Sequence, residues 1–223
     1  KITARKDFVP MSSIVVSRTA YRFTTLMHEE HPEALAQLSE GHPYDVSTNI
    51  FERLPQIFFD EKPEDGKDYI RILGRIGNNR VYKYVRRDYI RPVDNLDNYK
   101  VFLSKANGTG EFGEVLTSPF AGEPGTGNTE TFISIGQLGS RYEAEALVKY
   151  IKTRFLRVLL GALKTTQDIT PEKWQYVPVQ NFTAQSDIDW SLSADAIDEL
   201  LYTKYALTTA ERDFICKKVR KME

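Results

Sequence analysis

The longest regular pattern of hydrophobic positions in the chain runs from residue 140 to residue 164. Apolar side chains recur there at steps of three and four residues, the spacing of one helix face, at Ala144, Leu147, Val148, Ile151, Phe155, Val158, Leu159 and Ala162. Ser140 followed by Glu143 predicts a capping box at the start. The pattern therefore predicts one long amphipathic helix, whose opposite side is an exposed basic ridge formed by Lys149, Thr153, Arg157 and Lys164.

Residues 69–87 show the alternation that is typical of a β-hairpin. Isoleucines alternate with other residues along 69–76, the run Gly77-Asn78-Asn79 predicts a turn, and 80–87 continues as the second strand. Between residues 67 and 91 there are eight basic residues and two acidic ones, which gives a local net charge of +6. Tyrosines interleave with these cations. The segment is therefore predicted to be a basic, tyrosine-bearing hairpin.

The remaining segments predict further strands and a glycine-rich loop. Residues 8–18, 49–59, 100–106 and 129–135 are rich in β-branched and aromatic residues and are predicted to be strands. Between residues 108 and 127 lie six of the 13 glycines, and residues 108–113 match G-x-G-x-x-G. A dinucleotide site needs a helix that begins at the last glycine of this motif. No such helix is predicted, so we expect a surface loop.

Two amphipathic helices are predicted at the C-terminal end. Ser193 caps the first, and Thr208 with Glu211 forms a capping box for the second, in which Phe214, Ile215 and Val219 are expected to face inward. The predicted fold class is α+β (mixed α/β), with β-hairpins and a small sheet packed on the long amphipathic helix. Residues 1–185 are predicted to form one domain, on which the helix pair at 186–223 packs.

Composition narrows the class of protein. The 223 residues are 41% hydrophobic, enough to bury a core, and 30 basic residues balance 31 acidic ones. An electrostatic partner must therefore be met by a local patch. The single cysteine and the absence of a run of about 18 apolar residues favour a cytoplasmic protein with no membrane partner. The chain begins at Lys1 and enters a strand-like segment at once, which suggests a piece of a longer polypeptide.

Two patterns in the sequence are similar to metal sites, but neither is complete. His28, His31 and His42 are close in sequence, but Pro32 interrupts the helix that such ligands would need. Two Asp-x-Lys tripeptides, at 60–62 and 65–67, are typical of nucleases, yet no Pro-Asp dipeptide supplies a first metal-binding carboxylate. A solvated charged turn explains both tripeptides, so neither a metal site nor catalytic residues are predicted.

The basic hairpin and the basic ridge together predict a DNA-binding surface. Guanidinium groups suit phosphates and guanine edges, asparagine pairs with adenine, and a two-stranded ribbon fits the major groove. The predicted DNA-binding residues are Arg71, Arg75, Asn78, Asn79, Arg80, Lys83, Tyr84, Arg86, Arg87, Lys105, Lys149, Arg157 and Lys164. If four to six cations neutralise phosphates, the logarithm of affinity should fall with the logarithm of salt concentration with a slope of roughly −4 to −5.

Several sequence blocks, in this order, resemble a known family. They are RVYKYVRRDYI (80–90), YKVFLSKANGTGEFGE (99–114), TETFISIG (129–136), YIKTRFLRVLLGALKTTQ (150–167), YVPVQNFT (176–183) and SDIDWSLSADAIDELLYTKYALTTAERDFI (186–215). The chain from about residue 71 onward resembles the C-terminal, target-recognition part of bacterial single-chain restriction–modification proteins and adenine-specific DNA methyltransferases. Residues 1–60 lie outside the resemblance.

The resemblance implies a sequence-specific DNA-binding module of mixed α/β fold that follows an upstream methyltransferase domain of the same polypeptide. The chain has no Pro-Pro dipeptide, and therefore lacks the family's loop that holds the flipped adenine. The resemblance thus implies a module that is not an enzyme in isolation, with double-stranded DNA and the upstream domain as partners. S-adenosylmethionine and Mg²⁺ are expected only in the parent protein, an adenine-specific methyltransferase with or without endonuclease activity.

Two other classes of protein remain open on the sequence. The first is a protein-interaction or structural domain of a restriction–modification complex, without direct base readout, in which the basic face is solvated and the final helix pair docks a subunit. In such a domain the hairpin is simply the basic outer face of an ordinary sheet. The second is a hydrolase whose site has no recognisable motif.

Overall fold

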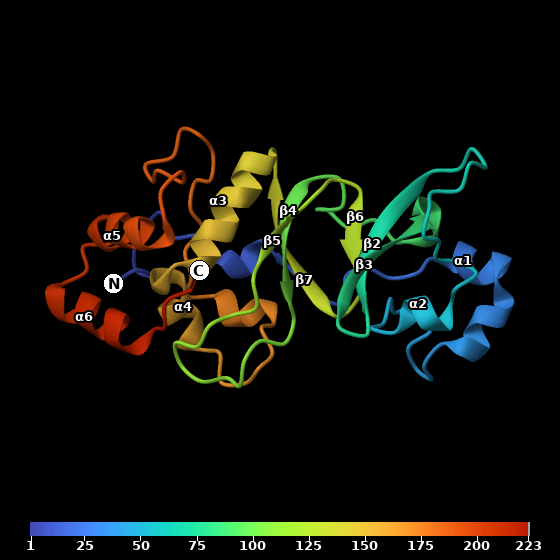
Figure 1. Cartoon of the computed structure of the whole chain (residues 1–223), viewed down its shortest axis with the longest axis horizontal. Helices are drawn as coiled ribbons and strands as arrows, with labels where there is room; N and C mark the ends of the chain where they lie inside the picture. Colours follow the sequence, from blue (N-terminus) through green and yellow to red (C-terminus); the bar gives the residue numbers. More distant parts are fainter. Residues whose placement is uncertain (223) are drawn as a thin grey trace.

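The computed structural model describes residues 1–222 and confirms the α+β class. Two small sheets stand next to each other along the long axis of the molecule (Figure 1). One sheet has the strand order β1-β7-β4-β5 and comprises β1 (Val15–Val16), β4 (Tyr99–Ser104), β5 (Phe120–Gly122) and β7 (Phe132–Leu138). The other has the order β3-β2-β6 and comprises β2 (Tyr69–Ile76), β3 (Asn79–Arg86) and β6 (Thr126–Asn128).

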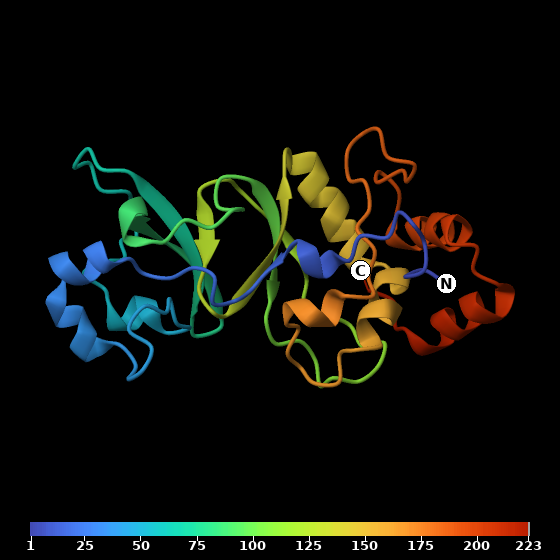
Figure 2. The same ribbon diagram turned by 180° about the vertical axis from the view of Figure 1, so that it is seen from behind.

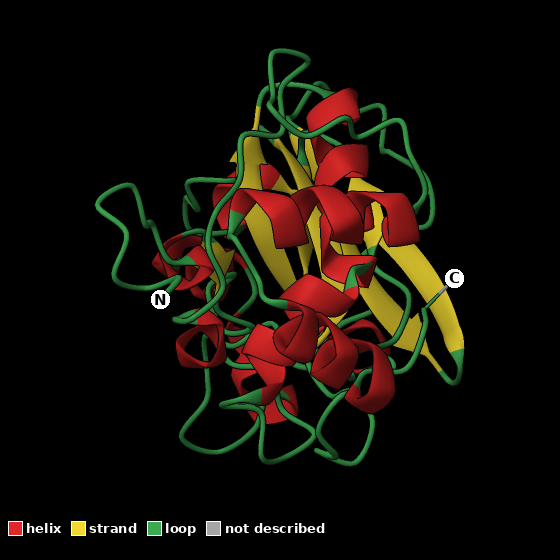
Figure 3. Ribbon diagram, turned by 90° about the vertical axis from the view of Figure 1, so that its left-hand side faces the viewer, coloured by secondary structure: helices red, strands yellow, loops and turns green. Residues whose placement is uncertain are grey.

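Helices lie on the outer side of each sheet. The helices are α1 (Thr25–Glu30), α2 (Ile50–Arg53), α3 (Arg141–Lys152), α4 (Arg154–Gly161), α5 (Ala194–Lys204) and α6 (Thr209–Lys218). Helices α1 and α2 lie beside the three-stranded sheet, α3 and α4 lie beside the four-stranded sheet, and α5 and α6 lie beyond α3 and α4 at the end of the molecule (Figure 1). Seen from the end that carries α5 and α6, the helices stand in front of the strands (Figure 3). Among the described residues, no helix combines the length and the apolar character needed to cross a membrane.

The predicted hairpin is confirmed. Strands β2 and β3 pair in antiparallel register from Tyr69 opposite Arg86 to Ile76 opposite Asn79. Gly77 begins the two-residue turn with φ +57°, a conformation that glycine adopts without strain. On the other side of β2, the short strand β6 pairs in parallel, with Thr126 opposite Arg71. The hairpin therefore has one edge partly covered by β6, and along the β3 edge Tyr84 pairs with Phe59.

The hydrophobic side chains form two main clusters rather than one. One cluster joins Val101, Leu103, Ile133 and Ile135 of the four-stranded sheet to α3, α4 and both C-terminal helices. The other joins Ile70, Ile72 and Val85 of the hairpin to α1, α2 and the segments around them. Between the sheets, Leu73 packs with Phe102 and Phe132 in a small third cluster. The predicted unit 1–185 thus contains both main clusters, and 186–223 is continuous with one of them.

The predicted helix 140–164 is wrong in one respect, because it is two helices. Ser140 caps α3 as predicted, but Thr153 has extended backbone angles and its hydroxyl accepts a hydrogen bond from Leu156 N–H at 3.1 Å. The carboxylate of Asp198, which lies on α5, accepts hydrogen bonds from the N–H groups of Arg154 and Phe155. Two capping groups thus begin a new helix at Arg154, and the cap from Asp198 comes from a distant part of the chain.

Three other elements differ from the predictions. Residues 49–59 form α2 and a following turn rather than a strand, because Ile50, Leu54 and Phe58 are buried at helical spacing. Of residues 8–18 only Val15 and Val16 pair as a strand, with β7. The glycine-rich stretch is not only a loop, because it contains β5 and β6. The strand predictions for 100–106 and 129–135 are confirmed by β4 and β7, with shifted ends.

The C-terminal helix pair is capped as predicted. Ser193 accepts a hydrogen bond from Ala196 N–H, and Thr208 with Glu211 forms a complete capping box. Ile215 and Val219 are buried, whereas Phe214, predicted to face inward, has 50% of its surface exposed. The N-terminal segment passes next to this pair before it crosses to the lobe that contains α1 (Figure 2).

Lys100 lies where the two sheets meet, with no exposed surface. Its ammonium donates hydrogen bonds to the carbonyl oxygens of Leu96 and Thr126 at 2.8 and 2.9 Å. Burial lowers the pKa of Lys100 to about 7, because the charged form loses its hydration.

Lys100 should make the stability of the protein depend on pH. The unfolded chain holds the lysine proton up to about pH 10.4, so between pH 7 and 10 it binds more protons than the folded protein. The free energy of unfolding should therefore rise with pH in this window, by about 2–3 kcal/mol between pH 7 and 9.5 relative to Lys100→Met. Urea denaturation at several pH values measures the free energy of unfolding, and Lys105→Met, at a half-buried lysine, is the control. If the free energies of unfolding of wild type and Lys100→Met differ by the same amount at every pH, the prediction is wrong.

Candidate nucleic-acid interface

The two faces of the hairpin have different surroundings. Side chains alternate between faces along a strand, and directly opposite residues share a face. Ile70, Ile72 and Val85 point into the cluster that contains α1 and α2. The other face carries Arg71, Leu73 and Arg75 of β2 with Arg80 and Tyr82 of β3, and through Leu73 it contacts the four-stranded sheet. This second face is where the unpaired cations of the hairpin gather.

Arg71, Arg75 and Arg80 form what we call the free-arginine face. None of the three lies within ion-pair distance of a carboxylate among the described residues. Their guanidinium groups rest instead on aromatic rings, of Tyr82 at 5.6 Å, Phe132 at 5.7 Å and Phe120 at 4.1 Å respectively. Stacking on a ring fixes the side chain, and each guanidinium makes only one hydrogen bond within the described part of the chain, although Nε of Arg75 is buried.

Arg75 and Arg80 stand directly opposite each other in the hairpin register. Like charges in this position destabilise a sheet, and no described carboxylate offsets the repulsion. Their hydrogen bonds are long ones to neutral acceptors, since Arg75 donates to Ser104 Oγ and Arg80 to the carbonyl oxygen of Ser118, both at 3.4 Å. The arrangement is one that a bound anion would stabilise.

The other hairpin cations are neutralised by carboxylates. Lys83 pairs with Asp60 at 2.5 Å, and Arg86 pairs with Glu30 and Asp88. Arg87 pairs with Asp68 at 2.7 Å and with Asp97 at 2.8 Å. The hydrogen bond from Arg87 lowers the pKa of Asp97. Asp60, Glu30 and Asp97 lie outside residues 67–91, and these three acids halve the predicted local charge from +6 to +3. Lys83, Arg86 and Arg87 therefore fit a structural role.

The remaining residues predicted on this side occupy peripheral positions. Asn78 and Asn79 are exposed at the hairpin tip, as predicted. Tyr84 is half-buried, and its backbone pairs with Phe59. Lys105 follows the end of β4, is half-buried, and has no carboxylate partner among the described residues. Arg75 of the hairpin contacts Ser104 of the four-stranded sheet, and Lys105 is the next residue in the chain. Lys105 therefore lies next to the contact between the hairpin and this sheet.

The predicted basic ridge is wrong, because Arg157 and Lys164 are only 2% and 3% exposed. Arg157 donates to the carbonyl oxygens of Glu114 and Arg220, and burial lowers its pKa to about 10. Lys164 donates to the carbonyl oxygen of Asn107 and forms a buried ion pair with the Glu114 carboxylate. The loop before β5 and the C-terminal residues cover the side of α4 that helical spacing alone suggested was exposed.

Lys149 is also engaged within the protein. Its ammonium donates to the carbonyl oxygens of Trp190, Ser191 and Leu192, at 2.8 to 3.1 Å. These three bonds use all of its donors and hold the turn that precedes α5. Lys149 therefore does not belong to an exposed phosphate-binding row, and the predicted ridge is removed from the candidate interface.

The glycine-rich motif folds around a carboxylate of its own. Glu114 accepts hydrogen bonds from the N–H groups of Thr109 and Gly110 at 2.7 and 3.1 Å. Burial acts to raise the pKa of Glu114, but the bonds from Lys164 and from these two N–H groups outweigh it, and the net shift is downward. The motif thus binds an internal anion where a dinucleotide site would bind phosphate. Among the described residues, no group of three or more His, Cys, Asp or Glu side chains is placed to hold a metal ion.

The aromatic rings on which the free arginines stack are not among the residues predicted for the site. Phe120 comes from β5, in a stretch predicted to be a loop, and Phe132 comes from β7, where the sequence predicts a strand but no site residue. Both lie in the other sheet, so strand alternation within the hairpin carries no signal for them. Tyr82 is on the hairpin itself and could have been found, because it shares a face with Leu73.

Comparisons with known proteins do not add to this geometry. No protein-family model matches the chain, and neither a curated protein nor a solved structure matches it. The function of the chain therefore has to be inferred from its own residues and their arrangement.

Proposed function

We propose that the chain binds double-stranded DNA through the free-arginine face and the tip of the β2–β3 hairpin, as the target-recognition module of a restriction–modification DNA methyltransferase. The observation that carries the proposal is that Arg75 and Arg80 stand opposite each other and that no carboxylate of the described residues lies within ion-pair distance of either. A protein that neutralises Lys83, Arg86 and Arg87 on the same hairpin, yet leaves these two charges facing each other, is well suited to an external polyanion.

The part of the hairpin beyond β6 is two-stranded, and its exposed tip suits the groove of a duplex. A two-stranded ribbon fits the major groove of B-DNA, where guanidinium groups bind guanine edges and phosphates. Stacking on Phe120 and Phe132 holds Arg80 and Arg75 in place before binding, which reduces the entropy lost on complex formation. In this proposal Asn78 and Asn79 contact base edges, whereas Arg71 contacts the DNA backbone.

The chemistry of the proposed system belongs to the parent protein. An upstream methyltransferase domain would bind S-adenosylmethionine and methylate adenine, and Mg²⁺ would be needed where the parent also cleaves. This chain would supply recognition and no catalytic group. The proposed location is the cytoplasm, where such systems act on DNA.

A gel-shift experiment on the purified chain tests the proposal. A mixed-sequence duplex of about 20 base pairs should be retarded at low salt and released as salt is raised. Labelled S-adenosylmethionine should give no methylated product, and plasmid DNA with Mg²⁺ should stay intact. Absence of a shift at low salt would favour the interaction-domain alternative, and turnover in either assay would contradict the recognition module.

A further inference from the structure

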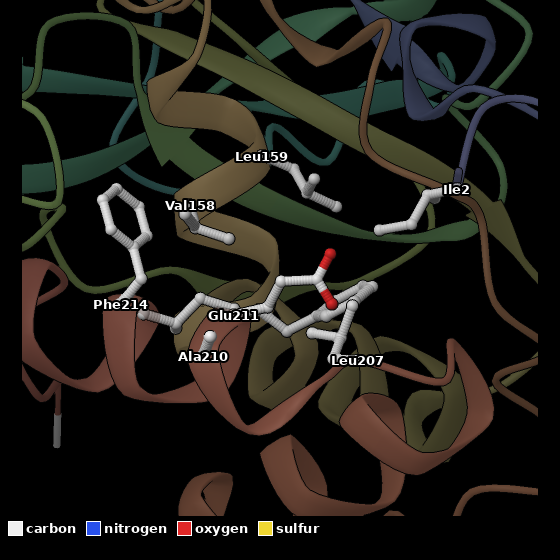
Figure 4. A pocket seen from close by; sticks show the side chains of 9 residues that line it. Ile2, Val158, Leu159, Leu207, Ala210, Glu211 and Phe214 are labelled. Carbon is white, nitrogen blue, oxygen red and sulfur yellow. The ribbon is translucent and has the colours of Figure 1, made fainter.

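An apolar groove lies between α4 and α6, in the lobe away from the hairpin. Its hollow measures about 390 Å³. Figure 4 shows Val158 and Leu159 of α4 on one side of the groove. On the other side lie Ala210 and Phe214 of α6 and Leu207, two residues before this helix. Ile2 closes the groove from the N-terminal segment. The groove is therefore built by segments that are far apart in the sequence.

The groove is longer than this one hollow. A second hollow of about 320 Å³ shares Ile2, Leu159 and Leu207 with the first and extends it to Ala162 and Tyr176. Phe214 is 50% exposed, an unusual position for a phenylalanine whose neighbour Ile215 is buried. An elongated groove with apolar walls and an exposed aromatic side chain is the form of surface that binds an amphipathic helix.

The charges at the rim of the groove are positive. Lys218 follows Phe214 by four residues and Lys217 follows Ala210 by seven, so both lie on the groove side of α6. Neither lies within ion-pair distance of a carboxylate of the described residues. Glu211, the one carboxylate that lines the hollow, is paired with Lys1 at 3.1 Å. The groove therefore has apolar walls, and two exposed lysines without an ion-pair partner among the described residues follow it along α6.

We propose that this groove binds an amphipathic helix of a partner protein that carries acidic residues beside its apolar face. The apolar residues of that helix would fill the groove, and its carboxylates would pair with Lys217 and Lys218. The inference is independent of DNA binding, because it uses none of the hairpin residues.

Two synthetic peptides that differ only in charge test the inference. Both are helical, about 15 residues long, with leucine and phenylalanine at helical spacing, and they carry either glutamate or lysine beside the apolar face. Fluorescence anisotropy should show the glutamate peptide binding at least about tenfold more tightly. Lys217→Glu with Lys218→Glu should reverse the preference. Lys62→Glu with Lys67→Glu, two exposed lysines outside the groove, should leave it unchanged.

A second variant tests the apolar wall. Phe214→Ala should weaken binding of the glutamate peptide by about tenfold or more. Phe214 is half-exposed and packs only against the exposed ring of Phe112 among the aromatic residues described, at 6.1 Å between ring centroids, so the melting temperature should change little. Equal affinity for both peptides, no binding of either, or sedimentation that shows a dimer of this chain lost on Phe214→Ala would each overturn the inference. A loss of DNA binding on hairpin mutation would leave it unaffected.

Discussion

Replacing Lys164 by methionine should lower the free energy of unfolding by about 3–5 kcal/mol, the range that is typical when one partner of a buried ion pair is removed. Methionine fills much of the same volume, so the lost ammonium is the main change. Its removal leaves the 8% exposed carboxylate of Glu114 without its counter-charge, although the N–H groups of Thr109 and Gly110 still bind it. Urea denaturation at pH 7 measures the loss.

The double variant Glu114→Gln with Lys164→Met should regain much of this stability, because no buried charge remains. Lys173→Met, a half-buried lysine that pairs with no described carboxylate, serves as the matched control and should change stability by less than about 0.5 kcal/mol. A loss below about 1 kcal/mol for Lys164→Met would mean that Lys164 is solvated, as the predicted ridge required.

Replacing Arg71, Arg75 and Arg80 together by glutamine should weaken binding to duplex DNA by at least about 100-fold. Each arginine that contacts a base or phosphate contributes about 1–3 kcal/mol, and 1.4 kcal/mol corresponds to tenfold in affinity. The fold should survive, because the change also removes the repulsion between Arg75 and its opposite neighbour. Anisotropy with a labelled duplex measures affinity, and a melting curve checks the fold.

Lys83→Gln is the matched control on the same hairpin. Lys83 lies on the opposite face and is already paired with Asp60, so its loss should change DNA affinity by less than about threefold. If Lys83→Gln and the triple variant weaken binding equally, the hairpin attracts DNA through its overall charge alone. If neither weakens it, the DNA-binding surface lies elsewhere.

The sequence carried enough information to predict the hairpin and its turn. Both depend on neighbours in the chain, since alternation places Ile70 and Ile72 on one face and a glycine permits the turn. The caps at Ser140, Ser193 and Thr208 were predictable for the same reason, because a capping side chain binds the N–H of a residue three positions later.

The errors arose where contacts join distant parts of the chain. Helical spacing places Arg157 and Lys164 opposite the main apolar face, but it does not show that the loop containing Glu114 covers them. The break at Thr153 depends equally on Asp198, 45 residues later in the sequence. A count of charges likewise overstates the cationic character of the hairpin, since the acids that pair with Arg86 and Arg87 include Glu30 and Asp97.

The salt dependence of DNA binding tests the central claim most directly. Three free arginines, in place of the four to six cations predicted from the sequence, should give a slope of about −3 for the logarithm of affinity against the logarithm of salt concentration. The triple glutamine variant should reduce that slope nearly to zero. A wild-type slope near zero, or a slope that the triple variant leaves unchanged, would contradict the assignment of DNA binding to the free-arginine face.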